Sequence, residues 1–447
     1  MRKAISFLVL LIMGLGLTAS FGGVVMAEEN GMMKESDVQS AVNVSCTVSE
    51  TGEKKKNSLL LEPNDGNFSG VWLALEGLEK FEVGEKAHIE LRVRVEASTV
   101  TGYSPINFTD EAVNYIDGAF RVKVWQNLLF DARVYMRDGK KCVFLGVKNA
   151  NKTKIYLGSA TVSDDVYELE NIFGGVTLYQ IEPKQNQCES FIFVTKSGKL
   201  IVIDGGDYDD KDNLLSVIRT YKNEVDDWYI THYHCDHVYA LIRILNEEDI
   251  YIRNLYYDFN VSEETLNGYG DEDNHLVKDM AEAVKNNAHK IGKIITPKKG
   301  DEFVTDEVKI KVLNDAKFLD RANMPNDSSV TYKAETPGKS ILFLGDLGSY
   351  GGTLLKDKND SYFLDEAKTC DVVQLAHHGQ SGIDINDYQY LTSMKVALYC
   401  APRWLFDCDS GSGVGSGSWQ TLKTREAMRV LKVRYQFASD NGRIIFK

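Results

Sequence analysis

Three histidines and an aspartate fall within six positions of the segment Thr231-His232-Tyr233-His234-Cys235-Asp236-His237. Imidazole nitrogens and carboxylate oxygens are common ligands of zinc and related divalent ions. His232 and His234 alternate on an extended segment, so their side chains point the same way, whereas Asp236 and His237 lie where residues 238–245 turn helical. The chain holds only 8 histidines. This spacing therefore favours a metal site over a chance cluster, and the two pairs could serve two ions.

Two further apolar runs end in side chains of the same kind. The run that ends at residue 344 leads into Gly345-Asp346, and the run that ends at residue 376 leads into His377-His378-Gly379. Because strand ends along one edge of a sheet converge in space, we expect these residues to share one cleft with the first motif. Asp204, at another strand end, is interpreted as a structural acid that supports the histidine-containing loop.

The rest of the chain has to position these groups, and its 447 residues predict two domains. Residues 58–171 show period-two alternation, as in Ile89, Leu91 and Val93, which predicts an all-β sandwich with His88 on the outward, solvated face. Residues 174–447 alternate strands with helical stretches, such as residues 214–221 and 280–288. That pattern predicts an α/β domain of sheets covered by helices.

The N-terminus carries Arg2 and Lys3, then an apolar run that closes with Val25-Met26-Ala27. This pattern predicts a signal peptide over residues 1–27 and a secreted or cell-surface protein. The alternative is an uncleaved anchor, which is the only membrane contact that the sequence suggests. Residues 28–57 are polar with little apolar periodicity, and we interpret them as a flexible linker.

The formal net charge of −14 makes the chain strongly acidic. Acidity disfavours nucleic acid as a partner, because Lys and Arg supply most affinity for phosphates, although bound cations would reverse the field locally. We therefore expect an anionic small-molecule or polymer substrate at the metal site. The seven cysteines contain no CxxC motif. Cys400 and Cys408 are the only close pair, and they form either a disulfide or two free thiols.

Four motifs follow one another along residues 204–379: Asp-Gly-Gly, His-x-His-x-Asp-His, Gly-Asp and His-His-Gly. This order resembles the metallo-β-lactamase-fold hydrolases. Within them it looks most like the C-terminal domain of bacterial competence (DNA-uptake channel) proteins, to which residues 297–301, 308–313, 326–330 and 434–442 are also similar. The resemblance covers residues 174–447 and implies an αββα metallo-β-lactamase-like sandwich. It excludes the N-terminal domain, and the uptake role is not carried over.

The resemblance also implies roles for individual residues. His232 and His234 would hold a first metal, Asp236 and His237 a second, and Asp346 would bridge both. His377 or His378 would complete the second site. A carboxylate between two divalent ions about 3.5–4 Å apart leaves room for a bridging hydroxide as nucleophile, which Asp236 could orient or deprotonate as the catalytic residue. The nitrogen and oxygen ligands suit zinc, with manganese as an alternative.

This chain departs from the family pattern in two places. Most members have a further histidine where Asn326-Asp327 stands here, so Asp327 either ligates the first metal or leaves that ion weakly held. Gln380 replaces a common serine after His-His-Gly. Three further residues are candidates for substrate binding, each with a purely structural role as the alternative: Ser328, Ser329 and Arg403.

Together these observations predict an exported dinuclear metal-dependent hydrolase, of phosphodiesterase type, that uses a metal-bridging hydroxide. One alternative is an acyl hydrolase acting on a lactone, thioester or β-lactam, because the same hydroxide attacks acyl carbon. The alternative from another class is a surface-binding protein in which the sandwich acts and the metal site is residual.

Overall fold

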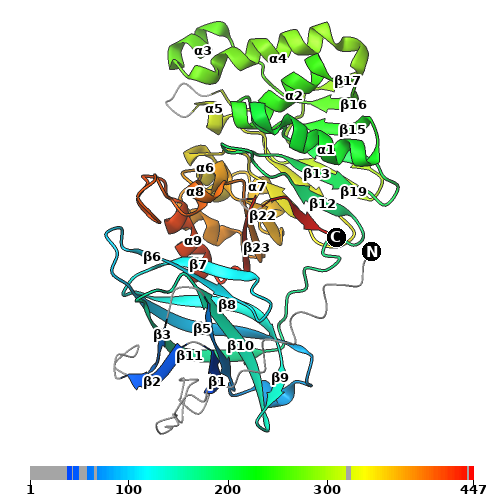
Figure 1. Ribbon diagram of the computed structural model, residues 1–447. Coiled ribbons are helices and arrows are strands. Elements are labelled where there is room, and N and C mark those ends of the chain that lie inside the picture. Colours follow the sequence, from blue (N-terminus) through cyan, green and yellow to red (C-terminus); the bar gives the residue numbers. More distant parts are fainter. Residues whose placement is uncertain (1–37, 43, 50–57, 65–67, 319–323, 440–441) are drawn as a thin grey trace.

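The computed structural model describes residues 38–42, 44–49, 58–64, 68–318, 324–439 and 442–447. Within this part of the chain, two β-sheets form an N-terminal domain, and two further sheets flanked by helices form a C-terminal domain (Figure 1). The predicted signal peptide, residues 1–27, lies outside the described residues. No helix among the described residues combines the length and the apolar character that crossing a bilayer requires.

The N-terminal domain is an all-β sandwich, as predicted. One sheet runs in the order β1 (Val38–Val42), β4 (Ser69–Leu73), β10 (Lys140–Lys148), β6 (Tyr103–Thr109) and β7 (Tyr115–Arg121), with β9 (Tyr135–Arg137) beside β10. The other runs β2 (Val44–Ser49), β3 (Ser58–Pro63), β11 (Lys154–Ser163), β5 (Lys86–Glu96) and β8 (Trp125–Arg133). Both sheets send apolar side chains into one core, because alternate residues such as Ile89, Leu91 and Val93 point inward.

The C-terminal domain contains two mixed sheets of seven strands each. The first runs β17 (Ile291–Ile295), β16 (Tyr251–Tyr256), β15 (Glu224–Tyr229), β14 (Leu200–Ile203), β13 (Phe191–Val194), β12 (Thr177–Gln180) and β25 (Ile444–Phe446). The second runs β18 (Glu302–Thr305), β19 (Val308–Val312), β20 (Tyr332–Glu335), β21 (Ile341–Phe343), β22 (Val372–Gln374), β23 (Val396–Tyr399) and β24 (Tyr435–Ala438). β14 and β15 pair in parallel, as do β21 and β22. Each pair therefore ends at one edge of its sheet.

Helices cover the outer faces of both sheets, which gives four layers in the order αββα. The described helices are α1 (Lys211–Tyr221), α2 (Cys235–Glu247), α3 (Glu263–Tyr269), α4 (His275–Asn286), α5 (Met324–Asp327), α6 (Ser349–Lys356), α7 (Tyr362–Ala367), α8 (Arg403–Phe406) and α9 (Thr421–Val430). Short 3-10 helices are η3 (Leu78–Lys80), η4 (Tyr208–Asp210), η5 (Glu272–Asn274), η6 (Ala288–Lys290), η7 (Ala376–Gly379) and η8 (Ile385–Tyr390). Aromatic residues such as Phe191, Phe193 and Phe343 fill the space between the sheets. The predicted αββα fold class is confirmed.

α9 joins the two domains through buried ion pairs. Arg429 Nε lies 2.6 Å from Asp117 Oδ2 on β7, and Arg425 Nη2 lies 3.3 Å from Asp117 Oδ1. All three side chains are buried, and α9 packs against β8 as well (Figure 1). Burial alone would raise the pKa of Asp117, but the two guanidinium groups hold it below its usual value. The sandwich therefore docks on the C-terminal domain through paired charges.

Two predictions about the N-terminal region were wrong. β1 and β2 lie inside residues 28–57, which we had interpreted as a flexible linker; their few apolar residues still pair with β4 and β3. The other residues of that stretch lie outside the described part of the chain. His88 is buried rather than solvated, and it contacts Asp131, which Tyr435 of the C-terminal domain also contacts. His88 Nδ1 and the Tyr435 hydroxyl lie 2.7 and 2.6 Å from the two oxygens of Asp131.

Candidate metal centre

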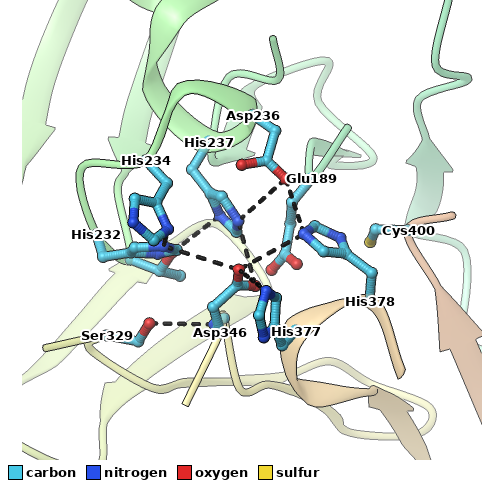
Figure 2. A network of polar contacts seen from close by, with 12 residues as sticks. Glu189, His232, His234, Asp236, His237, Ser329, Asp346, His377, His378 and Cys400 are labelled. Atoms are coloured by element: carbon cyan, nitrogen blue, oxygen red, sulfur yellow. Dashed lines mark hydrogen bonds and ion pairs between the residues drawn. The ribbon is translucent and has the colours of Figure 1, made fainter. Parts of the chain in front are cut away.

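The parallel strand ends of both sheets deliver the predicted motifs to one place (Figure 2). β14 leads into Asp204, and β15 leads into the loop that carries His232 before α2 begins at Cys235. β21 leads into Asp346, and β22 leads into the η7 turn. The expectation that separate strands bring these residues together is therefore met by the structure.

His232 and His234 form the first group of candidate ligands. His232 Nε2 and His234 Nδ1 lie 3.0 Å apart, so the two rings aim at a shared point. His232 Nε2 also lies 3.8 Å from Asp346 Oδ2. The other nitrogen of His234, Nε2, lies 3.6 Å from Asp271 Oδ2, on the loop after α3. One side of this group therefore faces Asp346, and Asp271 lies on its other side.

The second group contains Asp236, His237 and His378, again beside Asp346. His378 Nε2 lies 2.8 Å from Asp236 Oδ2 and 3.5 Å from Asp346 Oδ2. His237 Nε2 lies 3.2 Å from Asp346 Oδ1 and 3.8 Å from Asp236 Oδ2. Asp346 is therefore the one carboxylate that both groups share, which is the place expected for a bridging ligand.

His377 and His378 occupy consecutive positions in the η7 turn but face different surroundings. Both have left-handed backbone, with φ of 50° and 55°, a conformation that costs of order 1–3 kcal/mol per residue outside glycine. His378 is buried in the second group. His377 is partly exposed; its Nε2 lies 3.7 Å from Asp346 Oδ2, and its Nδ1 lies 3.0 Å from Ser381 Oγ. Of the two, His378 therefore fits the second site, and His377 lies on its open side.

The acids and imidazoles of the cluster shift each other's pKa strongly. Burial alone would lower the pKa of His378, but Asp346 and Asp236 raise it to about 10. Burial would likewise lower the pKa of His237, which Asp346, Asp236 and Asp204 raise well above its ordinary value. His378 and His237 in turn hold the pKa of Asp346 well below the usual range, against its burial. In the metal-free cluster, the negative charges of the carboxylates are therefore compensated by protonated imidazoles.

Several buried atoms of the cluster have no regular hydrogen-bond partner among the described residues. They include His237 Nε2, His378 Nε2 and Asp346 Oδ1. Buried polar atoms in folded proteins are nearly always satisfied, so orphans that face one another indicate a missing ligand. Ligand atoms of His232, His237 and Asp346 lie within 4.8 Å of one another, as do those of Asp236, His237 and His378. The nitrogen and oxygen donors fit zinc or manganese.

Asp204 takes the supporting position that we expected. Its Oδ1 accepts a hydrogen bond from the Thr231 backbone N–H at 2.7 Å, and its Oδ2 accepts one from the Thr231 hydroxyl at 2.7 Å. Asp204 Oδ2 also lies 2.8 Å from His237 Nδ1. This contact aims His237 Nε2 into the cluster, an arrangement that metal-binding histidines typically show.

Four other predicted site residues lie outside the groups of clustered ligand atoms, although Ser329 adjoins Asp346. Asp327 Oδ1 accepts a hydrogen bond from the Tyr350 backbone N–H at 3.1 Å, and Asp327 joins none of the described groups of clustered ligand atoms. Ser328 and Ser329 are buried: Ser328 donates to the Pro325 carbonyl at 2.6 Å, and Ser329 accepts from the Asp346 backbone N–H at 3.1 Å. In these contacts both serines order the loops around the cluster.

The fourth of these residues, Arg403, lies near the domain junction. Its Nε makes an ion pair of 2.7 Å with Asp407, and its guanidinium lies 5.8 Å from the centre of the Tyr115 ring. Cys400 and Cys408, the close pair of the sequence, are both free thiols, and no disulfide occurs among the described residues.

Sequence reasoning missed three side chains next to the cluster: Glu189, Asp271 and Cys400. Ligand atoms of Glu189, His378 and Cys400 lie within 4.8 Å of one another. Burial raises the pKa of Glu189 well above its usual value. No motif marks these residues, because each is a single residue beside an ordinary strand or loop. The one available signal was an acid at position 189, directly before the apolar run of β13.

A pocket of about 290 Å³ adjoins the η7 turn. Its lining includes Ser381, whose hydroxyl contacts His377, together with Ile383, Asn386 and Gln420. The pocket is thus lined by Ala376 and Gly379, the residues on either side of His377 and His378.

Two helix-covered sheets with a buried His/Asp cluster at their strand ends define an αββα protein with a candidate dinuclear metal centre. Residues 185–403 match the family model of the metallo-β-lactamase superfamily. This chain therefore contains a domain of that superfamily, whose members are generally metal-dependent hydrolases. The match includes every cluster residue and leaves out the N-terminal sandwich. No curated protein gives a significant match to the chain.

Three similar solved structures have 10–11% sequence identity to this chain. The metallo-β-lactamase fold protein YhfI of Bacillus subtilis has a TM-score of 0.39 at 10% identity, with 60% of this chain and 98% of YhfI covered. Zinc-bound PqqB of Methylobacterium extorquens has a TM-score of 0.37 at 10% identity, with 61% and 99% covered. Unliganded yeast PDE1 has a TM-score of 0.40 at 11% identity, with 61% and 99% covered.

Proposed function

We propose that the C-terminal domain is a dinuclear metal-dependent hydrolase that cleaves phosphodiesters. The observation that carries the proposal is the convergence of two groups of imidazole and carboxylate ligands on the shared, buried Asp346. His232 and His234 would hold one ion, and Asp236, His237 and His378 the other. When bound, two such ions activate water at neutral pH and stabilise charge on the attacked and leaving oxygens.

The protein's own residues have distinct tasks in this proposal. Asp236 faces the cluster within 2.8 Å of His378 Nε2, so its carboxylate can orient the attacking water and accept its proton. His377 lies on the open side, partly exposed, and is placed to contact the substrate's leaving group. The pocket beside η7 would hold one substituent of the ester.

An anionic ester is consistent with the charges of the protein only when cations are present. The chain carries a formal net charge of −14, which repels phosphodiesters at long range. Bound divalent ions reverse the field at the site, so binding of the substrate would depend on them. The similarity of residues 297–301 and 326–330 to competence-like domains also favours phosphodiester over acyl chemistry.

The test combines metal analysis with turnover of a model substrate. We expect close to two ions of zinc or manganese per chain and metal-dependent hydrolysis of bis(4-nitrophenyl) phosphate. His234→Ala removes a ligand and should lower the rate more than about 100-fold, since loss of an outer support alone costs about 10–100-fold. His289→Ala is the matched control, because His289 is exposed on η6 and outside the cluster.

Two results would contradict the proposal. Hydrolysis of 4-nitrophenyl acetate or a lactone, with no action on phosphodiesters, would move the function to acyl transfer. A purified holo protein without bound metal would favour a binding role for the sandwich.

We also propose that the protein is exported and that residues 1–27 are removed. The apolar run after Arg2 and Lys3 supports this. N-terminal sequencing of the protein recovered outside the cytoplasm should give a chain that begins at Glu28. A chain that still begins at Met1 in the membrane fraction would indicate an uncleaved anchor instead.

A further inference from the structure

The cluster contains a buried acid with no role in the proposed ligand groups. Glu189 precedes β13 and is fully buried. Its Oε2 accepts a hydrogen bond from Gln374 Nε2 at 2.7 Å, but its Oε1 has no hydrogen-bond partner among the described residues. A buried acceptor left unsatisfied typically costs about 1–3 kcal/mol, and more when it is charged. A carboxylate in this position needs a compensating partner.

The neighbouring imidazole of His378 offers a candidate partner for this oxygen. His378 Nε2 faces Asp236 and Asp346, so its Nδ1 faces the opposite side of the ring. His378 Nδ1 is buried and has no hydrogen-bond partner among the described residues either. Figure 2 shows the Glu189 carboxylate next to this ring, with Cys400 beyond the ring on the other side. A thiol is a weak acceptor, so the carboxylate is the stronger partner of the two.

The backbone and Gln374 hold Glu189 rigidly in place. The Glu189 N–H donates to the Asp236 carbonyl at 3.0 Å, and the Glu189 carbonyl accepts from the Gly206 N–H at 3.1 Å. Gln374 Oε1 in turn accepts from the backbone N–H of Gly345 at 3.0 Å, directly before Asp346. Glu189 is therefore connected to the segments of three cluster residues, and its carboxylate has little freedom to turn away.

Two of the three other candidate ligand histidines already have a carboxylate beside the nitrogen that faces away from the metal site. Asp204 Oδ2 lies 2.8 Å from His237 Nδ1, and Asp271 Oδ2 lies 3.6 Å from His234 Nε2. A histidine that ligates a metal through one nitrogen donates its other N–H to an acceptor, most often a carboxylate or a carbonyl. Glu189 would complete this pattern for His378.

We propose that Glu189 is a positioning residue that accepts a hydrogen bond from His378 Nδ1–H and so directs His378 Nε2 into the metal group of Asp236. This inference rests on the proposed metal centre but not on its substrate. It predicts that Glu189 affects one ion more than the other, because the candidate ligands grouped with Glu189, His378 and His237, both belong to the group of Asp236.

The first test measures zinc binding without any substrate. Metal-depleted full-length protein is titrated with Zn²⁺ in competition with a chromophoric chelator, for wild type and Glu189→Gln. The glutamine keeps the shape, and its amide oxygen can accept from Gln374 Nε2, but its NH2 group is a donor and cannot accept from His378 Nδ1–H. We expect one of two ions to bind about 10–100-fold more weakly. Glu182→Gln is the control, since the Glu182 carboxylate pairs with Arg443 at 2.9 and 3.0 Å and belongs to none of the described groups of clustered ligand atoms.

The second test does not depend on the folding of a variant. In zinc-loaded wild type, long-range ¹H–¹⁵N correlation spectra should show His378 protonated at Nδ1 and metal-bound through Nε2. Equal zinc affinities in wild type and Glu189→Gln, or a His378 ring unprotonated at Nδ1, would overturn the inference. So would a third zinc equivalent that Cys400→Ser abolishes, since Glu189, His378 and Cys400 would then form an ion site themselves.

These outcomes are separate from those of the proposed function. A wild type that hydrolyses no phosphodiester, while Glu189→Gln still weakens one ion, would reject the function and retain the positioning role. Full phosphodiesterase activity in the wild type, with unchanged zinc affinity in Glu189→Gln, would retain the function and reject the positioning role.

Discussion

Asp346→Asn removes one negative charge from the centre of the cluster and keeps the size of the side chain. The oxygens of Asp346 lie 3.2 Å from the Nε2 of His237, 3.5 Å from that of His378 and 3.8 Å from that of His232. Ions held by these nitrogens at about 2.0–2.1 Å would lie within about 4 Å of the carboxylate. At that distance a unit charge pair is worth about 4 kcal/mol at an effective dielectric constant of about 20.

Each ion should therefore bind about a thousandfold more weakly to Asp346→Asn. Competition titration with a chromophoric chelator, read for both ions, measures this loss. Asp371→Asn is the matched control, because Asp371 lies just before β22, at the end of that strand opposite the η7 turn, and contacts Lys339 at 3.0 Å. If Asp346→Asn retained both ions with less than a threefold change in affinity, a shared carboxylate would not be what holds them together.

Three further predictions follow from the described contacts. The metal-free protein should lose melting temperature as the pH rises from about 6.5 toward about 10, because His378 has its pKa raised to about 10 in the fold and releases its stabilising proton over that range; calorimetry should show a flatter profile for His378→Gln. Asp117→Ala leaves Arg429 buried without its acid, whereas Arg425 keeps Asp407 at 3.2 Å. It should lower the free energy of unfolding by about 3–5 kcal/mol, as urea denaturation would measure; a shift below about 1 kcal/mol would contradict the pairing. Asp204→Asn should weaken zinc binding about 10–100-fold in calorimetric titrations, and unchanged binding would mean that His237 needs no outer acid.

The ligand-bearing segments could be predicted from the sequence because each combines two local signals. An apolar run marks a strand, and the residues that follow it carry ligand chemistry, as in the loop with His232 and His234. Parallel strands then bring such ends to one edge without further information. The shared position of Asp346 and the choice of His378 over His377 depend on side-chain directions, which spacing alone does not determine.

The misplaced and missed residues have a common physical cause. Asp327 and Ser329 have suitable chemistry and lie in nearby loops, yet Asp327 Oδ1 and the Ser329 hydroxyl each accept a hydrogen bond from a backbone N–H group. Conversely, Glu189 reaches the cluster through tertiary packing of β13 beside β14, with no motif around it. Local sequence indicates which groups could act, whereas burial and backbone hydrogen bonding decide which of them are available.

The charged junction at α9 constrains how this protein can be rearranged. If the C-terminal domain were produced alone, Arg425 would keep Phe406 and Asp407, but Arg429 would lose its acid and would be uncovered on the surface of an acidic protein. The sandwich alone would present Asp117 without its counter-ions. Neither domain can therefore be transferred to another protein without exposing charged residues that have lost their partners. A gene fusion that separates the two domains would leave unpaired charges on the surface where they met.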